Sequence, residues 1–486
     1  MRSTASMCLP SRIAAVDLHV SLSDRRRVSA DLYRQLRDAI LEGRLRAHEA
    51  LPSTRELSQR LQVSRNTVSL AYDRLCAEGF LTTRAGAGTF VCEGIRPRAQ
   101  KRVTESPLKA RALWDSIPDA PDMSLVRVDF DFRTGVPDAS RFPFAEWRTR
   151  ISRQFHRRAV GAGTHISSAG HPGLCAAIAR HIGVSRAVRA TADDVLVTNG
   201  SQQAMDLIAR VLLEPGDLVA LEDPGYMLPR RLFETHGCRI AGVPVDDRGL
   251  VVAAIPSRTR LIYVTPSHQY PLGMAMAMER RQALLEWAQR ARATIVEDDY
   301  DAEFRYGGRP LEPLQSVDGS GRVLYVGSFS KILLPTLRLG FLVAPASLRP
   351  ALLKAKFLTD WHTAVPTQVA AAEFIEDGLL ARHIRRMRRV YAERHEHIRQ
   401  LLLTLFRGKL EPLPSTGGLH LAAFLTSRVT LPDTTIATRA RAAGIAIAPL
   451  SRHYLSKRPR RGLLFGYGAI TTDRIEDGLR RLRACL

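Results

Sequence analysis

The N-terminal part of the chain shows apolar residues at the three- and four-residue spacing of amphipathic helices. A first helix is predicted over residues 29–43, where Gly43 ends it and where one apolar face is formed by Leu32, Leu36, Ala39 and Ile40. Ser53, with Glu56 three residues later, is a capping box that begins a second helix.

A third helix is predicted after Ser64, which caps it, and its apolar stripe consists of Val68, Ala71, Tyr72 and Leu75. The following segment, LTTRAGAGTFV over residues 81–91, predicts two short strands joined by a glycine-rich tip. Helices in this order, followed by such a hairpin, indicate a helix-turn-helix with a β-wing.

The pattern changes from about Val126 onward, where short apolar runs alternate with amphipathic helical segments. Examples of these runs are DVLVTNG, DLVALEDPG, RLIYVTPS, ATIVEDDYD and RVLYVGSFSK. This alternation is typical of an α/β domain with a mainly parallel sheet flanked by helices. Residues 93–125 lie between the two patterns and are rich in Pro, Arg, Lys and Ser, which is linker composition. We therefore divide the chain into an N-terminal extension (1–24), a winged helix (25–92), a linker (93–125) and a large domain (126–486).

Composition adds a strong positive charge to this picture. The chain has 71 Lys and Arg against 48 Asp and Glu, which gives a formal net charge of +23. Such a field favours polyanions, and nucleic acid is the first candidate. A general enrichment in arginine is an equally good explanation of the charge, so DNA binding has to be argued from particular residues.

The cysteines and the apolar runs indicate the compartment. The 6 cysteines are scattered without a C-x-x-C pair, which argues against zinc and against a disulfide framework. No run approaches the roughly 20 apolar residues that span a bilayer. We expect a soluble, cytoplasmic protein without a membrane segment and without a bound metal.

Candidate DNA contacts come from the third predicted helix and the wing. A recognition helix docks by its N-terminal end, which places Ser64, Arg65, Asn66 and Thr67 at the major groove. Arg and Asn side chains can make paired contacts with guanine and adenine edges. Arg55 in the second helix is a candidate for a phosphate contact, and Arg84 and Gly86 lie at the wing, where glycine permits close approach.

Candidate chemistry in the large domain follows the ends of the predicted strands, where α/β sheets bind their ligands. Ser201 and Gln202 open a helix and could form a phosphate cradle with its amides. Tyr226 follows the next strand and could present a flat ring. Asp298 could keep a pyridine nitrogen protonated, and Tyr300 could bond a phenolic oxygen. A metal site is the alternative interpretation of the acidic residues in this segment, although no histidine adjoins them in the sequence. These residues are Glu297, Asp298, Asp299 and Asp301.

The sharpest signal is VLYVGSFSKILLPTLRLGF. A strand ends in Ser328 and Ser330 and is followed by Lys331, the residue type that forms a Schiff base with pyridoxal 5'-phosphate (PLP). Arg338, seven residues later, is placed to pair with a phosphate.

These motifs resemble known families. LPSTRELSQRLQVSRNTVSLAYDRLCAEGFL resembles the winged helix of the GntR family, which supports the DNA contacts named above. The later motifs resemble class I aminotransferases of fold type I, which implies a small C-terminal α/β subdomain. In that fold the phosphate is held by Ser201, Gln202, Ser328, Ser330 and Arg338, while Tyr226 stacks on the ring. The resemblance also implies that Arg452 holds a carboxylate.

A GntR winged helix joined to such a domain is the architecture of the MocR family of regulators. The resemblance implies a head-to-tail homodimer that binds double-stranded operator half-sites. We expect a transcription regulator in which an amine or amino-acid effector, or PLP itself, is sensed through the Schiff base at Lys331. Aminotransferases usually have Asn-Pro where this chain has Tyr270-Pro271, which favours a sensor over a catalyst.

Three alternatives remain open at this point. The chain could be a working aminotransferase with a regulatory appendage, a sensor of free PLP, or an architectural DNA binder that uses the large domain only to dimerise. The sequence does not specify the effector, the operator, or whether the protein activates or represses.

Overall fold

The computed structural model describes residues 28–94, 109–118, 128–156, 165–307 and 312–486. The chain forms two compact units, Met1–Arg111 and Ala112–Leu486, and each is described by itself. The extension predicted over residues 1–24 and most of the linker predicted over 93–125 lie outside the described residues.

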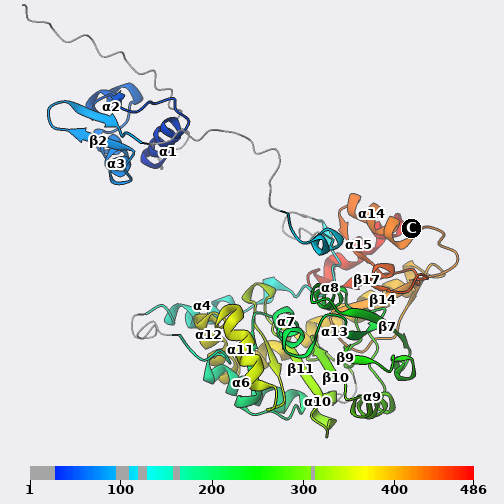
Figure 1. The fold of residues 1–486 in the computed structure, drawn as a ribbon. Helices are drawn as coiled ribbons and strands as arrows, with labels where there is room; N and C mark the ends of the chain where they lie inside the picture. Colours follow the sequence, from blue (N-terminus) through cyan, green and yellow to red (C-terminus); the bar gives the residue numbers. More distant parts are fainter. Residues whose placement is uncertain (1–27, 95–108, 119–127, 157–164, 308–311) are drawn as a thin grey trace, which may run out of the picture. The chain divides into compact units, whose positions relative to one another are not determined.

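The first unit is a winged helix (Figure 1). Its elements are α1 (Val28–Leu41), β1 (Ala50–Leu51), α2 (Thr54–Leu61), α3 (Arg65–Ala77), β2 (Leu81–Arg84) and β3 (Gly88–Val91). The strands form an antiparallel sheet in the order β1-β3-β2. The predicted apolar stripes of α1 and α3 meet in one core, which contains Leu36, Val68 and Leu75 at 0% exposure.

Ser53 and Ser64 cap the N-termini of α2 and α3, as the sequence predicted. The Ser53 hydroxyl accepts from the Glu56 amide at 3.1 Å, and the Ser64 hydroxyl accepts from the Thr67 amide at 3.1 Å. Each bond satisfies one of the free amides of a helix N-terminus. The Glu56 carboxylate lies 2.7 Å from Arg60 one turn later, so a salt bridge accompanies the serine cap.

The second unit is built around an eight-stranded mixed sheet in the order β5-β12-β11-β10-β9-β6-β7-β8. The strands are β5 (Val195–Thr198), β6 (Leu218–Asp223), β7 (Arg239–Asp246), β8 (Gly249–Leu250), β9 (Thr259–Val264), β10 (Thr294–Asp299), β11 (Val323–Ser328) and β12 (Gly340–Val343). Neighbours from β11 to β7 are parallel. Strand β12 runs antiparallel to both of its neighbours, and β8 runs antiparallel to β7.

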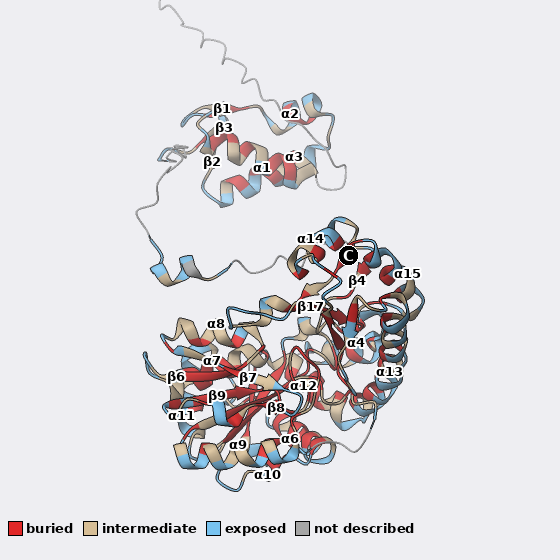
Figure 2. Cartoon of the chain, turned by 90° about the vertical axis from the view of Figure 1, so that its right-hand side faces the viewer, coloured by how far each residue is buried: buried red, intermediate tan, exposed pale blue. Residues whose placement is uncertain are grey.

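Helices cover both faces of this sheet, and the strands are buried between them (Figure 2). The helices of this part are α4 (Phe144–Arg153), α6 (Pro172–Arg186), α7 (Ser201–Leu212), α8 (Met227–Thr235), α9 (Met278–Ala291), α10 (Leu314–Val317), α11 (Arg349–Asp360) and α12 (Val365–Glu376). One core lies under α6 and α12, and another lies under α7 and α11. Burial on both faces explains why β6, β9, β10 and β11 are continuous apolar runs.

A smaller subdomain follows the long helix α13 (Leu379–Leu405). It contains a four-stranded antiparallel sheet in the order β13-β14-β17-β16. Its further elements are β13 (Leu410–Pro412), β14 (His420–Leu425), α14 (Asp433–Ala442), β15 (Ile445–Ala446), β16 (Ala448–Pro449), β17 (Gly462–Gly466) and α15 (Thr472–Arg483). Strand β4 (Phe130–Asp131) pairs with β15, so the subdomain is C-terminal except for this strand from the start of the unit.

Among the helices of the described residues, none has the length and apolar character that a membrane crossing requires.

Candidate functional site

The predicted DNA contacts at the recognition helix lie on the surface of the winged helix. Arg65 and Asn66 are exposed in the first turn of α3, next to the exposed cap Ser64. Thr67 is half-buried. The Arg65 Nε donates to the Thr54 hydroxyl at 3.3 Å, and its terminal nitrogens, which have no hydrogen-bond partner among the described residues, can reach a base edge.

The remaining candidates lie on α2 and at the wing. Arg55 is exposed on α2. Arg84 ends β2, and its guanidinium carbon lies 5.2 Å from the centre of the Phe90 ring. Gly86 has φ +75°, and a Cβ placed there would meet nothing within 4 Å. The turn therefore needs glycine for its backbone conformation, and the wing tip is open enough for a large partner.

A cavity of about 390 Å³ lies at the carboxyl ends of the central strands of the second unit. Its walls include Lys331 and all of the residues predicted to hold the cofactor, namely Ser201, Gln202, Tyr226, Asp298, Tyr300, Ser328, Ser330 and Arg338. The fold therefore brings together side chains that are up to 137 positions apart in the sequence, from Ser201 to Arg338.

Other wall residues were not predicted. Thr134 and Gly135 follow β4, and Leu419 and His420 come at the start of β14. No local motif marks these positions, because they reach the cavity through the packing of the small subdomain on the sheet. A Gly-Gly pair before Leu419 is the one local hint, since it allows the chain to pass close to Asp301.

Lys331 follows β11 and points its amine at the segment after β4. Its Nζ donates to the Gly135 carbonyl at 2.7 Å. Burial lowers the pKa of this amine, while the nearby carboxyls of Asp301 and Asp298 act in the opposite direction. A lysine with a lowered pKa has a larger fraction of the neutral amine, which is the form that attacks an aldehyde.

Asp298 is buried and has one free acceptor atom. Its Oδ2 accepts from the Tyr263 hydroxyl at 2.7 Å, whereas Oδ1 has no partner among the described residues. Burial raises the pKa of this carboxyl to about 7. A buried acceptor without a donor is costly, and a protonated pyridine nitrogen in the cavity would supply both the donor and the positive charge.

The opposite end of the cavity is built for an anion. Ser201 and Gln202 begin α7, whose free amides face this end, and Ser328 and Ser330 contribute hydroxyls. The Arg338 guanidinium donates to the Asn199 carbonyl at 3.0 Å. A Cβ on Gly200 would lie 2.7 Å from that guanidinium, so only glycine leaves room for Arg338 here. Together these groups match a phosphate dianion.

Three tyrosines form the wall between these two ends. Tyr226 and Tyr270 meet edge to face, with ring centroids 5.4 Å apart. The Tyr300 hydroxyl lies 3.0 Å from the His268 carbonyl and 2.9 Å from His268 Nδ1. A phenol has one proton to donate, so a bond to a cofactor oxygen requires Tyr300 to give up its bond to this carbonyl.

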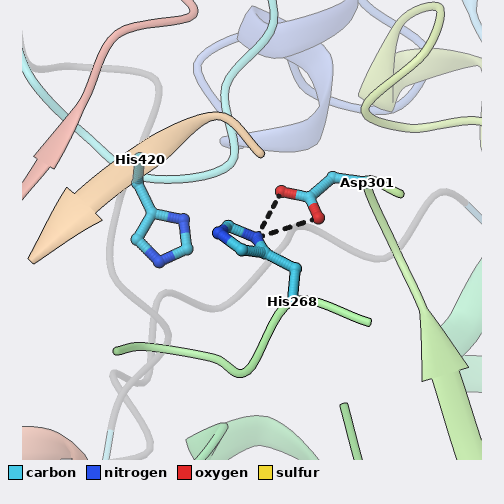
Figure 3. A group of neighbouring side chains, drawn as sticks. All are labelled: His268, Asp301 and His420. Atoms are coloured by element: carbon cyan, nitrogen blue, oxygen red, sulfur yellow. Dashed lines mark hydrogen bonds and ion pairs between the residues drawn. The ribbon is translucent and has the colours of Figure 1, made fainter. Parts of the chain in front are cut away.

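His268, Asp301 and His420 are buried side by side next to the cavity (Figure 3). His268 Nδ1 lies 3.1 Å from both Asp301 oxygens, and His420 Nε2 donates to the Pro271 carbonyl at 3.0 Å. Such a group has the residue types of a metal site. Each imidazole has a hydrogen-bond partner on one nitrogen, while His268 Nε2 has none among the described residues. We interpret the group as a polar network that fixes the wall of the cavity.

This arrangement changes the interpretation of the acidic run after β10. No histidine adjoins the run in the sequence, but the fold places His268 beside Asp301. The other carboxylates take separate partners: Glu297 accepts from the Leu314 amide at 2.8 Å, and Asp299 pairs with Arg186 at 2.8 Å. The four acidic groups are therefore divided between different contacts, and two of them, Asp298 and Asp301, line the cavity.

Arg452 lies in the 3-10 helix Leu450–His453 and is exposed. The cavity walls described above do not include it. Its neighbour His453 contacts Tyr270, with ring centroids 5.3 Å apart. A carboxylate contact by Arg452 remains a prediction, and it requires the side chain to turn toward the Tyr270 side of the cavity.

Comparison with known proteins agrees with both halves of the chain. Residues 28–91 match the model of bacterial regulatory proteins of the gntR family, and residues 130–460 match the model of aminotransferase class I and II. The probable rhizopine catabolism regulatory protein MocR of Rhizobium meliloti is 37% identical over 460 residues, covering 93% of this chain and 92% of the relative. The pyridoxine biosynthesis transcriptional regulator PdxR of Corynebacterium glutamicum is 31% identical over 459 residues, covering 94% and 96%.

A solved structure is similar to the second unit. LysN, the alpha-aminoadipate aminotransferase of Thermus thermophilus in complex with N-(5'-phosphopyridoxyl)-L-leucine, is 29% identical with a TM-score of 0.68, covering 74% of this chain and 92% of LysN. The chain thus belongs to the MocR family of DNA-binding transcription regulators, in which a GntR-type winged helix precedes an aminotransferase-like domain of fold type I with PLP as its cofactor.

Proposed function

We propose that Lys331 holds PLP as a Schiff base and that an amine or amino-acid effector is sensed by displacing this lysine. The observation that carries the proposal is the half-buried Lys331 amine, which faces the same cavity as Oδ1 of Asp298, an atom without a partner among the described residues. PLP supplies an aldehyde that exchanges one amine for another. The protein supplies an amine of lowered pKa, a carboxylate for the ring nitrogen, and a cradle for the phosphate.

The contacts around Lys331 explain how its release could change the structure outside the cavity. Lys331 donates to the Gly135 carbonyl at 2.7 Å, and the neighbouring Thr134 hydroxyl lies 3.0 Å from the Tyr270 hydroxyl. Loss of the lysine contact changes the partners of this segment, which directly follows β4. An effector acts only if it binds the alternative states with different affinity, and the difference would arise from this exchange of partners.

DNA is bound by the winged helix, and we propose Arg55, Ser64, Arg65, Asn66, Thr67, Arg84 and Gly86 as its contacts. Exposure of Arg65 and Asn66 at the start of α3 supports this assignment. A head-to-tail homodimer would present two such helices to paired half-sites. Exposed large apolar side chains on α11 and just after it, namely Phe357, Leu358 and Trp361, support a buried interface between copies.

The test is a Lys331→Ala variant of the full-length protein with Lys457→Ala as its control, since Lys457 is exposed in the loop before β17 and lies outside α11. Purified wild type and the control should be yellow, and the Lys331 variant should lose the Schiff-base absorbance after dialysis. Gel shifts with operator DNA should respond to an amine in the wild type and the control but not in the Lys331 variant. Persistent absorbance in the Lys331 variant would show that the lysine assignment is wrong.

A working aminotransferase is the second candidate, because the cavity contains the lysine, the aspartate and the phosphate cradle of that chemistry. Multiple-turnover assays with amine donors and keto acids separate it from a sensor. A response of the gel shift to PLP without any amine would instead indicate a sensor of the cofactor. The similarity to PdxR is the reason for including the gel shift with PLP alone.

A further inference from the structure

A second hollow in the aminotransferase-like unit has no residue in common with the cofactor cavity. This groove has a volume of about 710 Å³ and lies between α6, residues 302–305, and the end of α12 with the beginning of α13. Its volume exceeds that of the cofactor cavity, which is about 390 Å³. No motif in the sequence marked this groove, because its walls come from three segments far apart in the chain.

The groove contains more positive charge than its own carboxylates balance. The Arg305 guanidinium donates to the Gly307 carbonyl at 3.0 Å, and the Arg388 guanidinium donates to the Glu303 carbonyl at 2.8 Å. These contacts leave the charges in place. Arg385 is exposed on the wall and has no ion-pair partner within the described part of the chain.

The acidic groups of the groove are partly neutralised. Glu376 pairs with Arg180 at 2.9 Å. Burial raises the pKa of the Glu303 carboxyl to about 7, with Asp299 as the second cause. His181 Nε2 is buried and lies 4.0 Å from Glu303, which is too far for a hydrogen bond. The groove therefore has unused donors and an excess of guanidinium charge.

The floor of the same groove is apolar. It is formed by Ala177, Ala302, Ile375, Ala381 and Ile384, and Val184 at its rim is 91% exposed. Val184 adds apolar surface beside these arginines, so the groove combines apolar and cationic walls. A ligand that satisfies both features has a negative group at one end and an apolar body at the other.

We propose that this groove is a second ligand site, for a small organic acid whose carboxylate pairs with Arg385 and Arg388 and whose apolar body lies on Ala381 and Ile384. Arginine suits this task because its planar guanidinium binds a carboxylate through two parallel hydrogen bonds. The site is separate from the place where an amine would meet Lys331, so the protein would read two chemically different small molecules.

A short chain of contacts connects the groove to the cofactor cavity. Arg186 lines the groove, and its side chain donates to Asp299 at 2.8 Å and to the Ser267 hydroxyl at 2.8 Å. Asp299 adjoins Asp298, and Ser267 adjoins His268, in the chain. Because Arg186 lines the same groove as Arg385 and Arg388, a carboxylate bound in the groove would alter the electrostatic field at Asp298, and the cofactor absorbance provides a second readout.

The experiment measures binding of benzoate to the PLP-loaded, full-length protein by isothermal titration calorimetry. Benzyl alcohol is the uncharged match of benzoate, and phenyl phosphate tests a different anion on the same ring. The variants are Arg385→Gln combined with Arg388→Gln, and Ala381→Trp, which fills the groove without removing charge. Arg382→Gln is the control, because Arg382 is exposed on the same helix but does not line the groove.

Saturable binding of benzoate is expected for the wild type and for Arg382→Gln. Loss of the charged hydrogen bonds should weaken it by about tenfold or more in the double variant, and Ala381→Trp should block it. Benzyl alcohol should bind far more weakly than benzoate. The proposal is overturned if benzoate does not saturate the wild type, if the double variant binds it as Arg382→Gln does, or if phenyl phosphate alone binds. The yellow colour of every sample reports separately on Lys331, so failure here leaves the sensing proposal intact.

Discussion

A single methyl group added at Gly200 should weaken cofactor binding, because it would displace Arg338. The Cβ of an alanine at this position would lie 2.7 Å from the Arg338 terminal nitrogen, far inside normal contact distance. The obstructing atoms belong to the end of a flexible side chain, so Arg338 moves and the surrounding backbone stays. The guanidinium would then leave the end of the cavity that matches a phosphate.

The size of the effect follows from what Arg338 contributes. A hydrogen bond to a charged group contributes about 1.5–3 kcal/mol, which corresponds to about 10- to 150-fold in the dissociation constant of PLP. Gly200 also has φ +79° and ψ 174°, a conformation that is nearly restricted to glycine. Alanine there should reduce the free energy of unfolding by about 1–3 kcal/mol.

The control separates the two effects. Gly216→Ala also replaces a glycine at positive φ (+97°), but its Cβ would meet nothing within 4 Å. It should therefore reduce stability without changing PLP affinity. In an Arg338→Ala background, Gly200→Ala should change the affinity by less than about 0.5 kcal/mol, since its target is already gone.

The assay is a fluorescence titration of the apoprotein with PLP, together with urea unfolding of each variant. The steric explanation would be refuted if Gly200→Ala bound PLP as well as Gly216→Ala does. It would also be refuted if the loss in affinity were the same with and without Arg338.

Three further predictions concern other parts of the chain. Arg394→Met should cost about 1.5–3 kcal/mol in urea unfolding, because the buried Asp138 would lose its charged hydrogen bond from Arg394 at 2.6 Å and keep only Arg141, 3.5 Å away, as an ion-pair partner. Arg65→Ala should weaken binding to a specific operator by about 1–3 kcal/mol in gel shifts, while Arg46→Ala, on an exposed turn, should not. Burial raises the pKa of the Cys175 thiol to about 11, so iodoacetamide should label it in the folded protein only as the pH approaches that value; labelling of the native protein at neutral pH, detected by mass spectrometry, would contradict this.

Much of the architecture could be predicted because local rules decide it. Ser53 and Ser64 begin helices since their hydroxyls satisfy free amides within one turn. The apolar runs of β6, β9, β10 and β11 reveal strands that are buried on both faces. These signals lie within a few residues of the structure they specify. The sequence therefore predicted the winged helix and the sheet-based cofactor domain.

Other features depend on contacts between distant segments and left no local signal. The sequence GFLV of β12 has the same apolar character as the parallel strands of the sheet. The strand nevertheless runs antiparallel to both of its neighbours, β5 and β11. Strand β4 completes the small subdomain by pairing with β15, more than 300 residues later in the sequence. His420 and Gly135 reach the cavity through the same long-range packing. Periodicity detects the element but not its partner or direction.

The acidic run EDDYD shows how the fold divides groups that are adjacent in the sequence. Side chains alternate along a strand, so Asp298 faces the cavity while Glu297 and Asp299 point to the other side of the sheet. Each neighbour then acquires its own donors from α10 or from Arg186. A metal site was the alternative interpretation of this charge density, whereas alternation along the strand turns only Asp298 of its three carboxyls toward the cavity.

The segment after β4 is the point at which cofactor chemistry and the rest of the molecule meet. Gly135 accepts from Lys331, Thr134 contacts Tyr270, and Gly466 of β17 lies so close to Arg133 that a Cβ there would be 2.0 Å from the Arg133 carbonyl oxygen. This tight fit means that the segment cannot shift alone. Release of Lys331 would therefore be passed to β17 and the small subdomain as one packed body. In an aminotransferase that coupling would accompany each turnover. In a regulator of the kind proposed, the same coupling would pass the release of Lys331 from the cofactor cavity to the small subdomain.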